Sequence, residues 1–526
     1  MIHQNTPGAT TVRSATFDLL RAFGISTIFG NPGSTELPMY RDLPEDFRYV
    51  LGLQESIVLG MADGFAQATR NAALVNLHSA VGVGHALGNL FTAFVNQTPL
   101  IVTAGQQARS ILPFEPFLFA AQPTEFPKPY VKWAVEPARA EDVPLAIARA
   151  YHIAMQPPCG PVFVSIPIDD WDRPCDPVAV RRVSHAIEGE AALLAEAAAA
   201  LAAAERPAFV VGAQLARDGA WDQAIALAER HSAAVFASPN SARNSFPEDH
   251  PYFAGFLPAS REEIVKRLHG HDLILVLGAP VFTYHVEGAG PHIPEGATLF
   301  QLVDNPGVAS WAGAGTAITT SLKPGIDALL AGPAPRPRAP VPPRVSLARL
   351  DANVLSDAYV MQQVAALRPP ASIIVEEAPS SRLAMRARLP MIRPDSFYTT
   401  ASGGLGHAMP AAVGIAMARP GEKLIALIGD GSCMYAVQAL WSAAQHGLPI
   451  SFLILNNARY EALVRFSQRF GMNRTVGTEL PGLDFCALAQ GHGMEAVRVE
   501  QAADLDATLT RSFADPRPNL VEIRID

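Results

Sequence analysis

The sequence predicts an α/β protein built from three doubly wound domains with mainly parallel sheets. Short apolar runs that suit buried parallel strands alternate with segments of helical periodicity along the chain. The 526 residues are too many for one hydrophobic core, and such a length predicts about three or four domains. A proline-rich stretch from Pro333 to Pro343 predicts an extended, semi-rigid connector between two ordered parts. We place the domains at residues 1–180, 190–335 and 350–526.

The first domain opens with a helix and then alternates strands with helices. Apolar residues at helical spacing predict the helix, and Gly24 is its C-terminal stop. These apolar residues are Val12, Ala15, Leu19, Leu20 and Phe23. Short strands are expected at residues 27–29, 74–77, 100–102 and 162–166.

The second and third domains continue the same alternation. An alanine-rich helix at residues 190–204 leads into the second domain, where strands are expected at 209–211, 273–277 and 299–303. In the third domain we expect strands at residues 426–428 and 453–455, joined by one crossover helix around 438–444.

The two strands expected in the third domain each end abruptly in small or oxygen-bearing residues. One runs into Gly429, Asp430, Gly431 and Ser432, and the other into Asn457, which follows Asp430 by 27 positions. Because the carboxyl ends of parallel strands meet at one edge of a sheet, we expect Asp430 and Asn457 to lie close together. Their oxygens suit a hard cation such as Mg2+ that keeps phosphate oxygens in its shell. The glycines let the backbone come close, and Ser432 can donate to a phosphate at a helix start. The alternative is a pair of strand-end turns without a ligand.

Composition excludes several classes of function. The net charge of −9, without a basic run, argues against a nucleic-acid partner. No apolar run reaches the about 18 residues that span a bilayer, and the N-terminus lacks the apolar core of a signal peptide. Four widely spaced cysteines suggest reduced thiols, so we expect a cytoplasmic protein with no membrane partner. Hydrophobic residues make up 49% of the chain and charged residues 17%, which favours burial against other subunits.

A glycine-rich segment at residues 82–88 follows a strand and opens a helix, as a dinucleotide fingerprint would. Its spacing is G-x-G-x-x-x-G rather than G-x-G-x-x-G, and the next strand carries no acid for a ribose hydroxyl. Close helix packing explains these glycines better than a nicotinamide or flavin does.

The strand-end motif resembles the thiamine diphosphate motif, in which GDG is followed at a distance by NN. Further motifs in the same order extend the resemblance over almost the whole chain. They are FGNPGS at 29–34, LQE at 53–55, NLHSA at 76–80, GAPVF at 278–282 with Tyr284 and His285, and GGLG at 403–406. The sequence most resembles the benzoylformate decarboxylases among the thiamine diphosphate-dependent 2-oxo acid decarboxylases. This resemblance implies that the first and third domains share the thiamine diphosphate-binding fold.

The resemblance also implies roles for residues that hold the cofactor. Glu55 would face the pyrimidine nitrogen of thiamine diphosphate and promote deprotonation of the thiazolium. Its apolar neighbours would desolvate its carboxylate and raise its pKa, whereas the alternative is a helix-start glutamate facing solvent. The carbonyl of Gly403 would accept from the pyrimidine amino group, and Leu405 would separate the two rings; a generic glycine turn is the alternative. The metal ligands would be Asp430, Asn457 and the backbone carbonyl of Arg459, with Mg2+ as the ion and Ca2+ able to replace it in crystals. Other cofactor contacts would come from Ser380, Gly429, Gly431, Ser432 and Tyr460.

On the substrate side the resemblance assigns roles to Ser34, His78 and His285. Ser34 would bind the substrate carboxylate, His78 would protonate or polarise the keto oxygen, and His285 would protonate the enaminol carbon. A pKa of about 6.5 lets histidine give and take protons near neutrality, although a lone histidine is more often structural. Predicted pocket walls, each of which could equally be core, are Phe117, Leu118, Pro379, Ala462, Leu463 and Phe466.

The implied reaction is the non-oxidative decarboxylation of an aromatic 2-oxo acid, benzoylformate or a close relative, through a cofactor ylid and an enaminol. Pro379, Glu461 and Phe117 replace a threonine, a glycine and a smaller aliphatic residue of the family, which leaves the identity of the 2-oxo acid open. Alternatives within the cofactor class are a carboligase and a 2-hydroxyacyl-CoA or oxalyl-CoA type of lyase. A flavin or nicotinamide oxidoreductase and a non-catalytic member are the others.

The resemblance places the active site between the first domain of one chain and the third domain of another. A homodimer is then the smallest active unit, and a homotetramer is expected.

Overall fold

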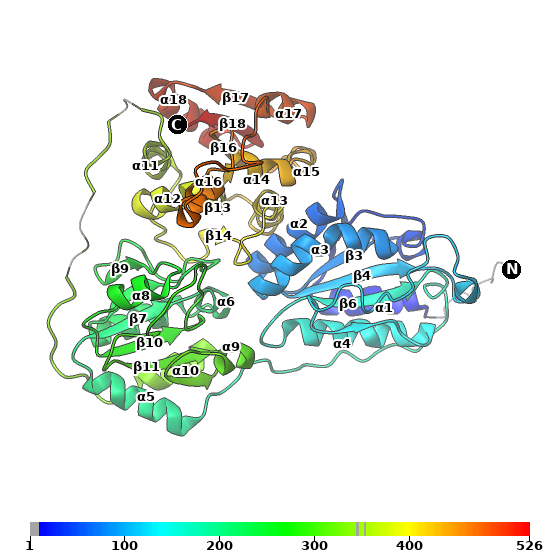
Figure 1. Ribbon diagram of the computed structural model, residues 1–526. Coiled ribbons are helices and arrows are strands. Elements are labelled where there is room, and N and C mark those ends of the chain that lie inside the picture. Colours follow the sequence, from blue (N-terminus) through cyan, green and yellow to red (C-terminus); the bar gives the residue numbers. More distant parts are fainter. Residues whose placement is uncertain (1–9, 343, 345–346, 352–353, 526) are drawn as a thin grey trace.

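The structure, a computed structural model, describes residues 10–525 except 343, 345–346 and 352–353 (Figure 1). The described chain contains three sheets of six strands each, and every pairing between their strands is parallel. Helices cover both faces of the sheets (Figure 1). The predicted class of three doubly wound α/β domains is therefore confirmed.

The first domain has the strand order β2-β1-β3-β4-β6-β5. Its strands are β1 Thr27–Gly30, β2 Arg48–Leu51, β3 Ala73–Leu77, β4 Leu100–Gln106, β5 Ala134–Val135 and β6 Val162–Pro167. Its helices are α1 Val12–Ala22, α2 Glu55–Thr69, α3 Ser79–Asn96 and α4 Val143–Met155, with 3-10 turns η1 Leu37–Tyr40, η2 Leu112–Phe114 and η3 Ala140–Asp142. The predicted opening helix is confirmed, and its last residues are followed by Gly24 at φ +73°.

The central domain has a different strand order, β12-β11-β10-β7-β8-β9. Its strands are β7 Pro207–Val211, β8 Ala234–Ala237, β9 Phe253–Phe256, β10 Leu273–Leu277, β11 Thr298–Val303 and β12 Thr316–Thr319. Its helices are α5 Ala191–Ala203, α6 Gln214–Asp218, α7 Trp221–His231, α8 Arg261–Arg267, α9 Pro306–Ser310 and α10 Leu322–Leu330.

The third domain repeats the topology of the first, with the order β14-β13-β15-β16-β18-β17. Its strands are β13 Ile373–Glu377, β14 Phe397–Thr399, β15 Leu424–Gly429, β16 Ile450–Asn456, β17 Glu495–Val499 and β18 Asn519–Arg524. Its helices are α11 Asp357–Leu367, α12 Arg382–Arg388, α13 Ala408–Ala418, α14 Asp430–Tyr435, α15 Ala439–Gln445, α16 Glu461–Ser467, α17 Phe485–Gly491 and α18 Ala502–Ala514, with 3-10 turns η4 Pro379–Ser381 and η5 Gln468–Phe470. The expected likeness of the first and third domains is confirmed by this shared strand order.

One local prediction was wrong. The crossover between β15 and β16 contains two short helices, α14 and α15, rather than one helix. The chain bends between them just after Tyr435, which packs against the loop glycine Gly406. The crossover therefore contacts the Gly403–Gly406 loop at this bend.

The proline-rich connector has neither helix nor strand at residues 333–342, as predicted, and Pro343 lies outside the described residues. Figure 1 shows it running along the outside of the central domain toward the third domain. The Arg338 guanidinium donates to the carbonyls of Leu201 and Ala204, which fastens this part of the connector to α5.

The first and third domains pack directly on each other through α2 and α13 and share one continuous hydrophobic core. A Cβ on Gly64 would overlap the backbone of Ala411, and a Cβ on Gly414 would overlap the carbonyl of Met61. Glycine is therefore required at both positions for the two helix backbones to meet. Among the described residues, no helix has the length and apolar character needed to cross a membrane.

Candidate active site

Helix α2 places Glu55 at its first position, where the chain leaves the end of β2. The Gln54 side chain caps the helix by accepting from the backbone N–H groups of Ser56 and Ile57. Glu55 is buried, with 9% of its surface exposed. Its Oε1 accepts from Asn31 Nδ2 at 3.3 Å, and its Oε2 lies 3.0 Å from His85 Nδ1. The carboxylate is therefore mostly shielded from solvent and contacts two polar side chains.

His78 lies beside Glu55 at the start of α3, and the two side chains meet across Gly82. A Cβ on Gly82 would lie 3.4 Å from Glu55 Cγ and 3.6 Å from His78 Cβ. His78 Nδ1 lies 2.8 Å from Glu36 Oε2 and 3.0 Å from Thr35 Oγ1. With Nδ1 engaged in this way, Nε2 is the nitrogen left for a ligand.

Glu36 was not predicted from the sequence as a site residue. Its side chain is fully buried and accepts from the backbone N–H groups of Gly33 and Gly105, each at 2.9 Å. The signal that could have found it is its place two residues after Ser34, at the end of the FGNPGS motif. Ser34 itself is exposed, and the neighbouring Gly33 packs against the His78 ring.

The ends of β15 and β16 bring the predicted metal ligands together. The Arg459 N–H lies 3.2 Å from Asp430 Oδ2 and 3.3 Å from Asn457 Oδ1, so the two side-chain oxygens converge. Asp430 Oδ1 accepts from the Gly431 N–H at 2.7 Å. Burial raises the pKa of Asp430, and the surrounding backbone N–H groups only partly offset this. Among the described residues, no basic side chain forms an ion pair with Asp430.

The loop from Gly403 to Gly406 is held between the first and third domains. The buried Glu377 carboxylate accepts from the backbone N–H groups of Gly406, His407 and Ala408 at 2.6–2.9 Å. At Gly403, φ is +72°, and a Cβ there would meet no heavy atom within 4 Å. The loop therefore has a fixed base and open space at Gly403.

A buried ion pair crosses the same junction. His407 Nε2 lies 2.5 Å from Asp63 Oδ2, and the two side chains are 2% and 0% exposed. Burial raises the pKa of Asp63, but the His407 charge and hydrogen bonds together hold it below its usual value. Burial alone would lower the pKa of His407. The charge of Asp63 and its hydrogen bond to His407 outweigh this effect, so the pKa of His407 is raised above its usual value. Both shifts favour the charged forms of the two side chains, and sequence reasoning missed both residues.

The predicted substrate residues from the central and third domains meet at α16. The His285 ring packs edge to face on Phe466, with centroids 5.0 Å apart. Arg465 of the same helix donates to the carbonyl of Ser380 at 3.0 Å, next to Pro379 in η4. A Cβ on Gly431 would overlap the Tyr460 ring, so Tyr460 lies over the start of α14.

The predicted residues form two separate groups within one chain. Among the described residues, no hydrogen bond or ion pair joins Glu55, His78 or Ser34 to the predicted metal ligands. Residues predicted to line the pocket are exposed in both groups. Phe117 in the first domain is 87% exposed, and Leu463 in the third domain is 57% exposed. Leu118 lies next to Phe117 and accepts from Ser79 Oγ, and Ala462 follows the first residue of α16.

A cavity of about 430 Å³ lies beside the first group and was not predicted. Its walls come from the start of α3 (Ser79, Val83), the end of β4 (Gly105) and the 120–126 segment that includes Phe126. Apolar walls with a few polar groups are typical of small-molecule sites.

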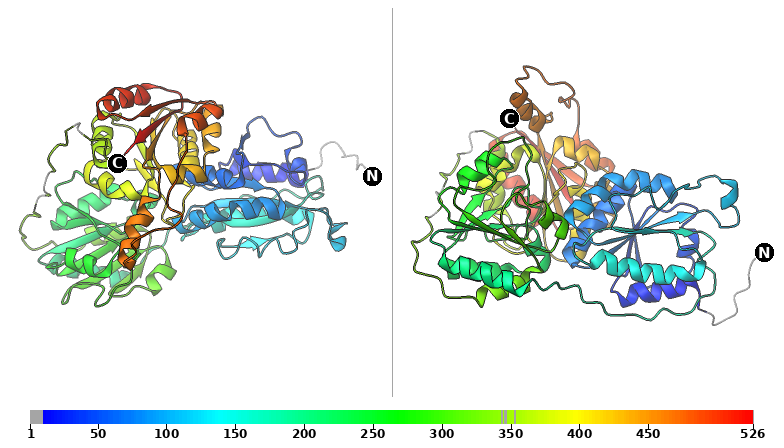
Figure 2. Two further views of the ribbon diagram at one scale, coloured as in Figure 1. Left: turned by 45° about the horizontal axis from the view of Figure 1, so that its top comes forward. Right: turned by 60° about the horizontal axis from the view of Figure 1, so that its bottom comes forward.

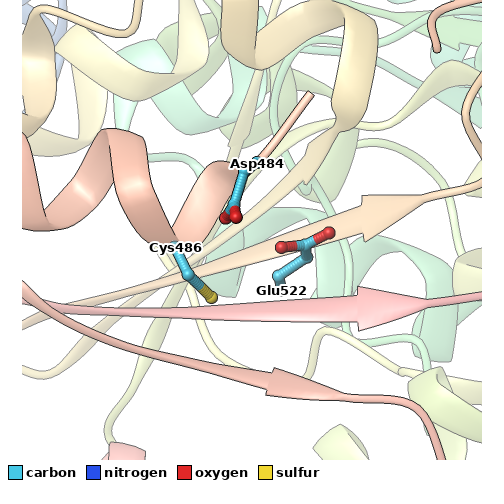
Figure 3. A group of neighbouring side chains, drawn as sticks. All are labelled: Asp484, Cys486 and Glu522. Carbon is cyan, nitrogen blue, oxygen red and sulfur yellow. The ribbon is translucent and has the colours of Figure 1, made fainter. Parts of the chain in front are cut away.

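Asp484, Cys486 and Glu522 form another cluster with a metal-like arrangement (Figure 3). Arg498 pairs with both acids, at 2.8 Å from Asp484 and 2.9 Å from Glu522. Asp484 also caps α17 by accepting from the Ala487 N–H. These contacts account for the two carboxylates, so we assign no metal to this cluster.

Comparison with protein-family models gives three matches that together cover most of the chain. They are the N-terminal thiamine pyrophosphate-binding domain at residues 10–122, the central domain of thiamine pyrophosphate enzymes at 194–328, and their C-terminal thiamine pyrophosphate-binding domain at 380–523.

The chain is also similar to individual proteins over its whole length. It is 42% identical over 519 residues to a benzoylformate decarboxylase of Pseudomonas aeruginosa, covering 98% of each chain. The crystal structure of benzoylformate decarboxylase from Polynucleobacter necessarius superposes with a TM-score of 0.96 at 39% identity, covering 98% of each chain. A thiamine diphosphate-dependent 4-hydroxybenzoylformate decarboxylase of Rhodococcus jostii gives 0.95 at 41% identity, covering 98% of this chain and 99% of that one.

Proposed function

Because this chain belongs to the thiamine pyrophosphate enzymes, we propose that it decarboxylates benzoylformate, or a close aromatic 2-oxo acid, to the aldehyde and carbon dioxide. The observation that carries this proposal is the end-to-end match, at 42% identity, to a benzoylformate decarboxylase. The similar Rhodococcus enzyme acts on a ring-hydroxylated relative of the same acid, which supports the aromatic class.

The third domain fits the diphosphate end of the cofactor together with a divalent cation. Asp430 is a buried carboxylate whose pKa is raised by burial, and within the described part of the chain no basic side chain forms an ion pair with it. A Mg2+ ion held by Asp430, Asn457 and the Arg459 carbonyl would supply that charge, and carboxylate and amide oxygens are ligands it accepts. Ser380, Gly429, Gly431, Ser432 and Tyr460 would surround the diphosphate. When bound, thiamine diphosphate supplies a thiazolium ring that stabilises negative charge on carbon.

The first domain would hold the pyrimidine end. Glu55 would face the pyrimidine nitrogen and could hold or give up a proton there through its carboxylate, which Asn31 and His85 contact. The open space at Gly403 leaves room for its carbonyl to accept from the amino group, with Leu405 beside it. Burial of Glu55 keeps competing water away from this exchange.

Three polar side chains would act on the substrate. Ser34 binds the carboxylate through its hydroxyl, and His78 donates from Nε2 to the keto oxygen while Glu36 holds its Nδ1. His285, whose ring packs on Phe466, would supply a proton on the substrate side of the site. Histidine suits both tasks because its usual pKa of about 6.5 is near neutrality. Phe117, Leu118, Pro379, Ala462, Leu463 and Phe466 would exclude water around the ring of the substrate.

We further propose a homodimer as the smallest active unit and a homotetramer as the complete assembly. In one chain the pyrimidine group and the metal group are separate, and apolar residues of both predicted walls are exposed. A second copy would cover these residues and complete the site. All four cysteines are free, which supports a cytoplasmic location, and we keep 1–180, 190–335 and 350–526 as the proposed domain limits.

The test is to incubate the protein with thiamine diphosphate, Mg2+ and a panel of 2-oxo acids, and to measure carbon dioxide and aldehyde. Equimolar carbon dioxide and benzaldehyde from benzoylformate are expected. A 2-hydroxy ketone as the main product would indicate a carboligase, and no turnover of any aromatic 2-oxo acid would refute the proposal. Glu55→Gln should lose most of this activity while keeping the fold. Full activity from a verified monomer would contradict the shared site.

A further inference from the structure

Glu461 begins α16 and is joined to the predicted metal loop through its backbone. Its N–H donates to the Arg459 carbonyl at 2.9 Å, and Tyr460 between them has φ −76° and ψ 68°, an inverse γ-turn. The N–H groups of Leu463 and Val464 donate to the Tyr460 carbonyl. The direction in which α16 leaves the metal loop is therefore set at Glu461.

The Glu461 side chain bridges two arginines. Its Oε2 lies 2.8 Å from Arg459 Nε, and its Oε1 lies 2.8 Å from Arg465 Nε. The Glu461 side chain is only 12% exposed, whereas the arginines are 42% and 53% exposed. A carboxylate this far removed from water needs opposite charge beside it, and here both oxygens have it.

The two arginines contact two different parts of the predicted site, the metal loop and η4. The Arg459 backbone N–H donates to Asp430 and Asn457, the predicted metal ligands. The Arg465 guanidinium donates to the Ser380 carbonyl in η4. One carboxylate thus links the metal loop, the helix of the substrate wall and the turn that carries Pro379.

Besides the contacts of Glu461, helix α16 packs on the central domain through Phe466 and His285. The segment closes at its base, where the Tyr460 N–H donates to Thr478 and the Leu480 N–H donates to Ala458, each at 2.7 Å. Figure 2 shows α16, in orange in the left view, standing outside the third sheet and reaching toward the central domain. Leu463 and Phe470 on this segment are exposed. The contacts of Glu461 are therefore among those that set where the helix lies.

We propose that Glu461 is a positioning residue that fixes α16 against the metal loop and η4 through its two arginines, and so sets the affinity for the 2-oxo acid. This inference rests on the proposed function, since Ala462, Leu463 and Phe466 of α16 are the predicted substrate wall. The role proposed for Glu461 requires no contact with the substrate or the cofactor. It acts through the helix that it begins.

Glu461→Gln keeps the shape of the side chain and removes the charge. In the holoenzyme, KM for benzoylformate should rise about fivefold to tenfold, the scale of one partly buried ion pair. The kcat should change by less than about twofold, because an interaction made equally in ground state and transition state is lost. The matched control is Glu495→Gln in β17, which removes an exposed glutamate paired with Arg517 in the same domain. That variant should leave KM unchanged.

Two further readouts separate positioning from general destabilisation. Hydrogen exchange should be faster at amides 461–467 in Glu461→Gln but not in Glu495→Gln. The KM difference between wild type and Glu461→Gln should shrink at high salt, which screens partly exposed charges. Arg465→Gln should raise KM as well, and the double variant should raise it by less than the product of the two single effects, because both single changes remove the Glu461–Arg465 pair.

Equal KM and equal exchange for wild type and Glu461→Gln would overturn the inference. Additive effects of Glu461→Gln and Arg465→Gln would also contradict it. A wild-type protein that does not decarboxylate benzoylformate would instead refute the proposed function, while the exchange measurement would still report whether Glu461 holds α16.

Discussion

Two regions of the third domain are held in place by different kinds of charged contact. At the inner junction, formed by Asp63, His407 and Glu377, the charged groups are buried and bridge two domains. At the outer edge, formed by α16 with Glu461, the arginines are partly exposed and the restraint is one side chain. The inner junction holds the Gly403–Gly406 loop, and the outer edge carries the predicted substrate wall. Several buried groups therefore hold the Gly403–Gly406 loop, whereas one carboxylate and two partly exposed arginines hold the start of α16.

The largest effect is expected for Asp63→Ala, which removes the buried ion pair of the inner junction. The change leaves His407 and Asn96, which donates to Asp63 at 3.1 Å, without their buried acceptor. Removing one partner of a buried pair costs about 3–5 kcal/mol, so the free energy of unfolding should fall by that amount. Chemical denaturation measures it. Asp18→Ala is the control, because its pair with Arg21 is exposed and is worth about 1 kcal/mol or less.

The same variant has a defined pH dependence. The lowered pKa of Asp63 contributes stability above its unfolded value of about 3.9 and loses it as pH falls through the folded value. The raised pKa of His407 contributes below about 6.5 and loses that stability as pH rises through the folded value. The stability difference between wild type and Asp63→Ala should therefore be largest at about pH 4–6.5. Equal losses for Asp63→Ala and Asp18→Ala would mean that the junction is not held by this pair.

The second prediction concerns the two histidines of the proposed site. His78→Ala and His285→Ala should each lower kcat/KM by about 10²-fold or more, the usual scale of general acid–base catalysis. Neither should destabilise the protein as Asp63→Ala does, because neither lies in the inner junction. His269→Ala, on an exposed surface of the central domain, is the control. Steady-state kinetics with benzoylformate and thermal unfolding give the two readouts, and wild-type rates in both variants would point to a different pocket.

The contrast between the two edges also explains what sequence reasoning reached. The proximity of Asp430 and Asn457 was predictable because each follows a buried parallel strand, and the topology brings the ends of such strands together. The class of three α/β domains was predictable because buried strands and helices leave different apolar patterns in the sequence. Asp63 and His407 were missed because an isolated charge gives no sign in the sequence that it is buried, and their contact spans 344 positions. The sequence marked Glu461 only as a departure from the glycine of the family. Its ion pairs with Arg459 and Arg465 depend on the γ-turn at Tyr460 and on helix α16, which the sequence alone did not show.

A third prediction concerns a buried carboxylate that has no ion-pair partner among the described residues. Glu248, between the central and third domains, accepts from the Met391 N–H at 3.0 Å, and burial raises its pKa to about 8. Arg344, Arg386 and Arg368 lower it only in part. Because the folded pKa is raised, the stability it contributes is complete below the unfolded value and is lost as pH rises toward 8. Wild type should lose about 1 kcal/mol of stability per pH unit between pH 6 and 8 from this group. In Glu248→Gln the unfolding midpoint should change less with pH over that range than in the wild type. The same pH dependence in both proteins would show that the pKa of Glu248 is not raised.

The smallest expected effect lies at the outer edge, in Pro379→Thr. Pro379 begins η4, where its missing N–H is no loss, and Arg465 holds the neighbouring Ser380 carbonyl. A threonine adds a hydroxyl to the proposed substrate wall, and one neutral hydrogen bond is worth about 0.5–1.5 kcal/mol. The ratio of kcat/KM for 4-hydroxybenzoylformate and benzoylformate should therefore change by about twofold to tenfold. The affinity for thiamine diphosphate, measured by calorimetry, should stay the same, because the inner junction is intact. A loss of cofactor affinity without a change in substrate ratio would show that the two edges are not independent.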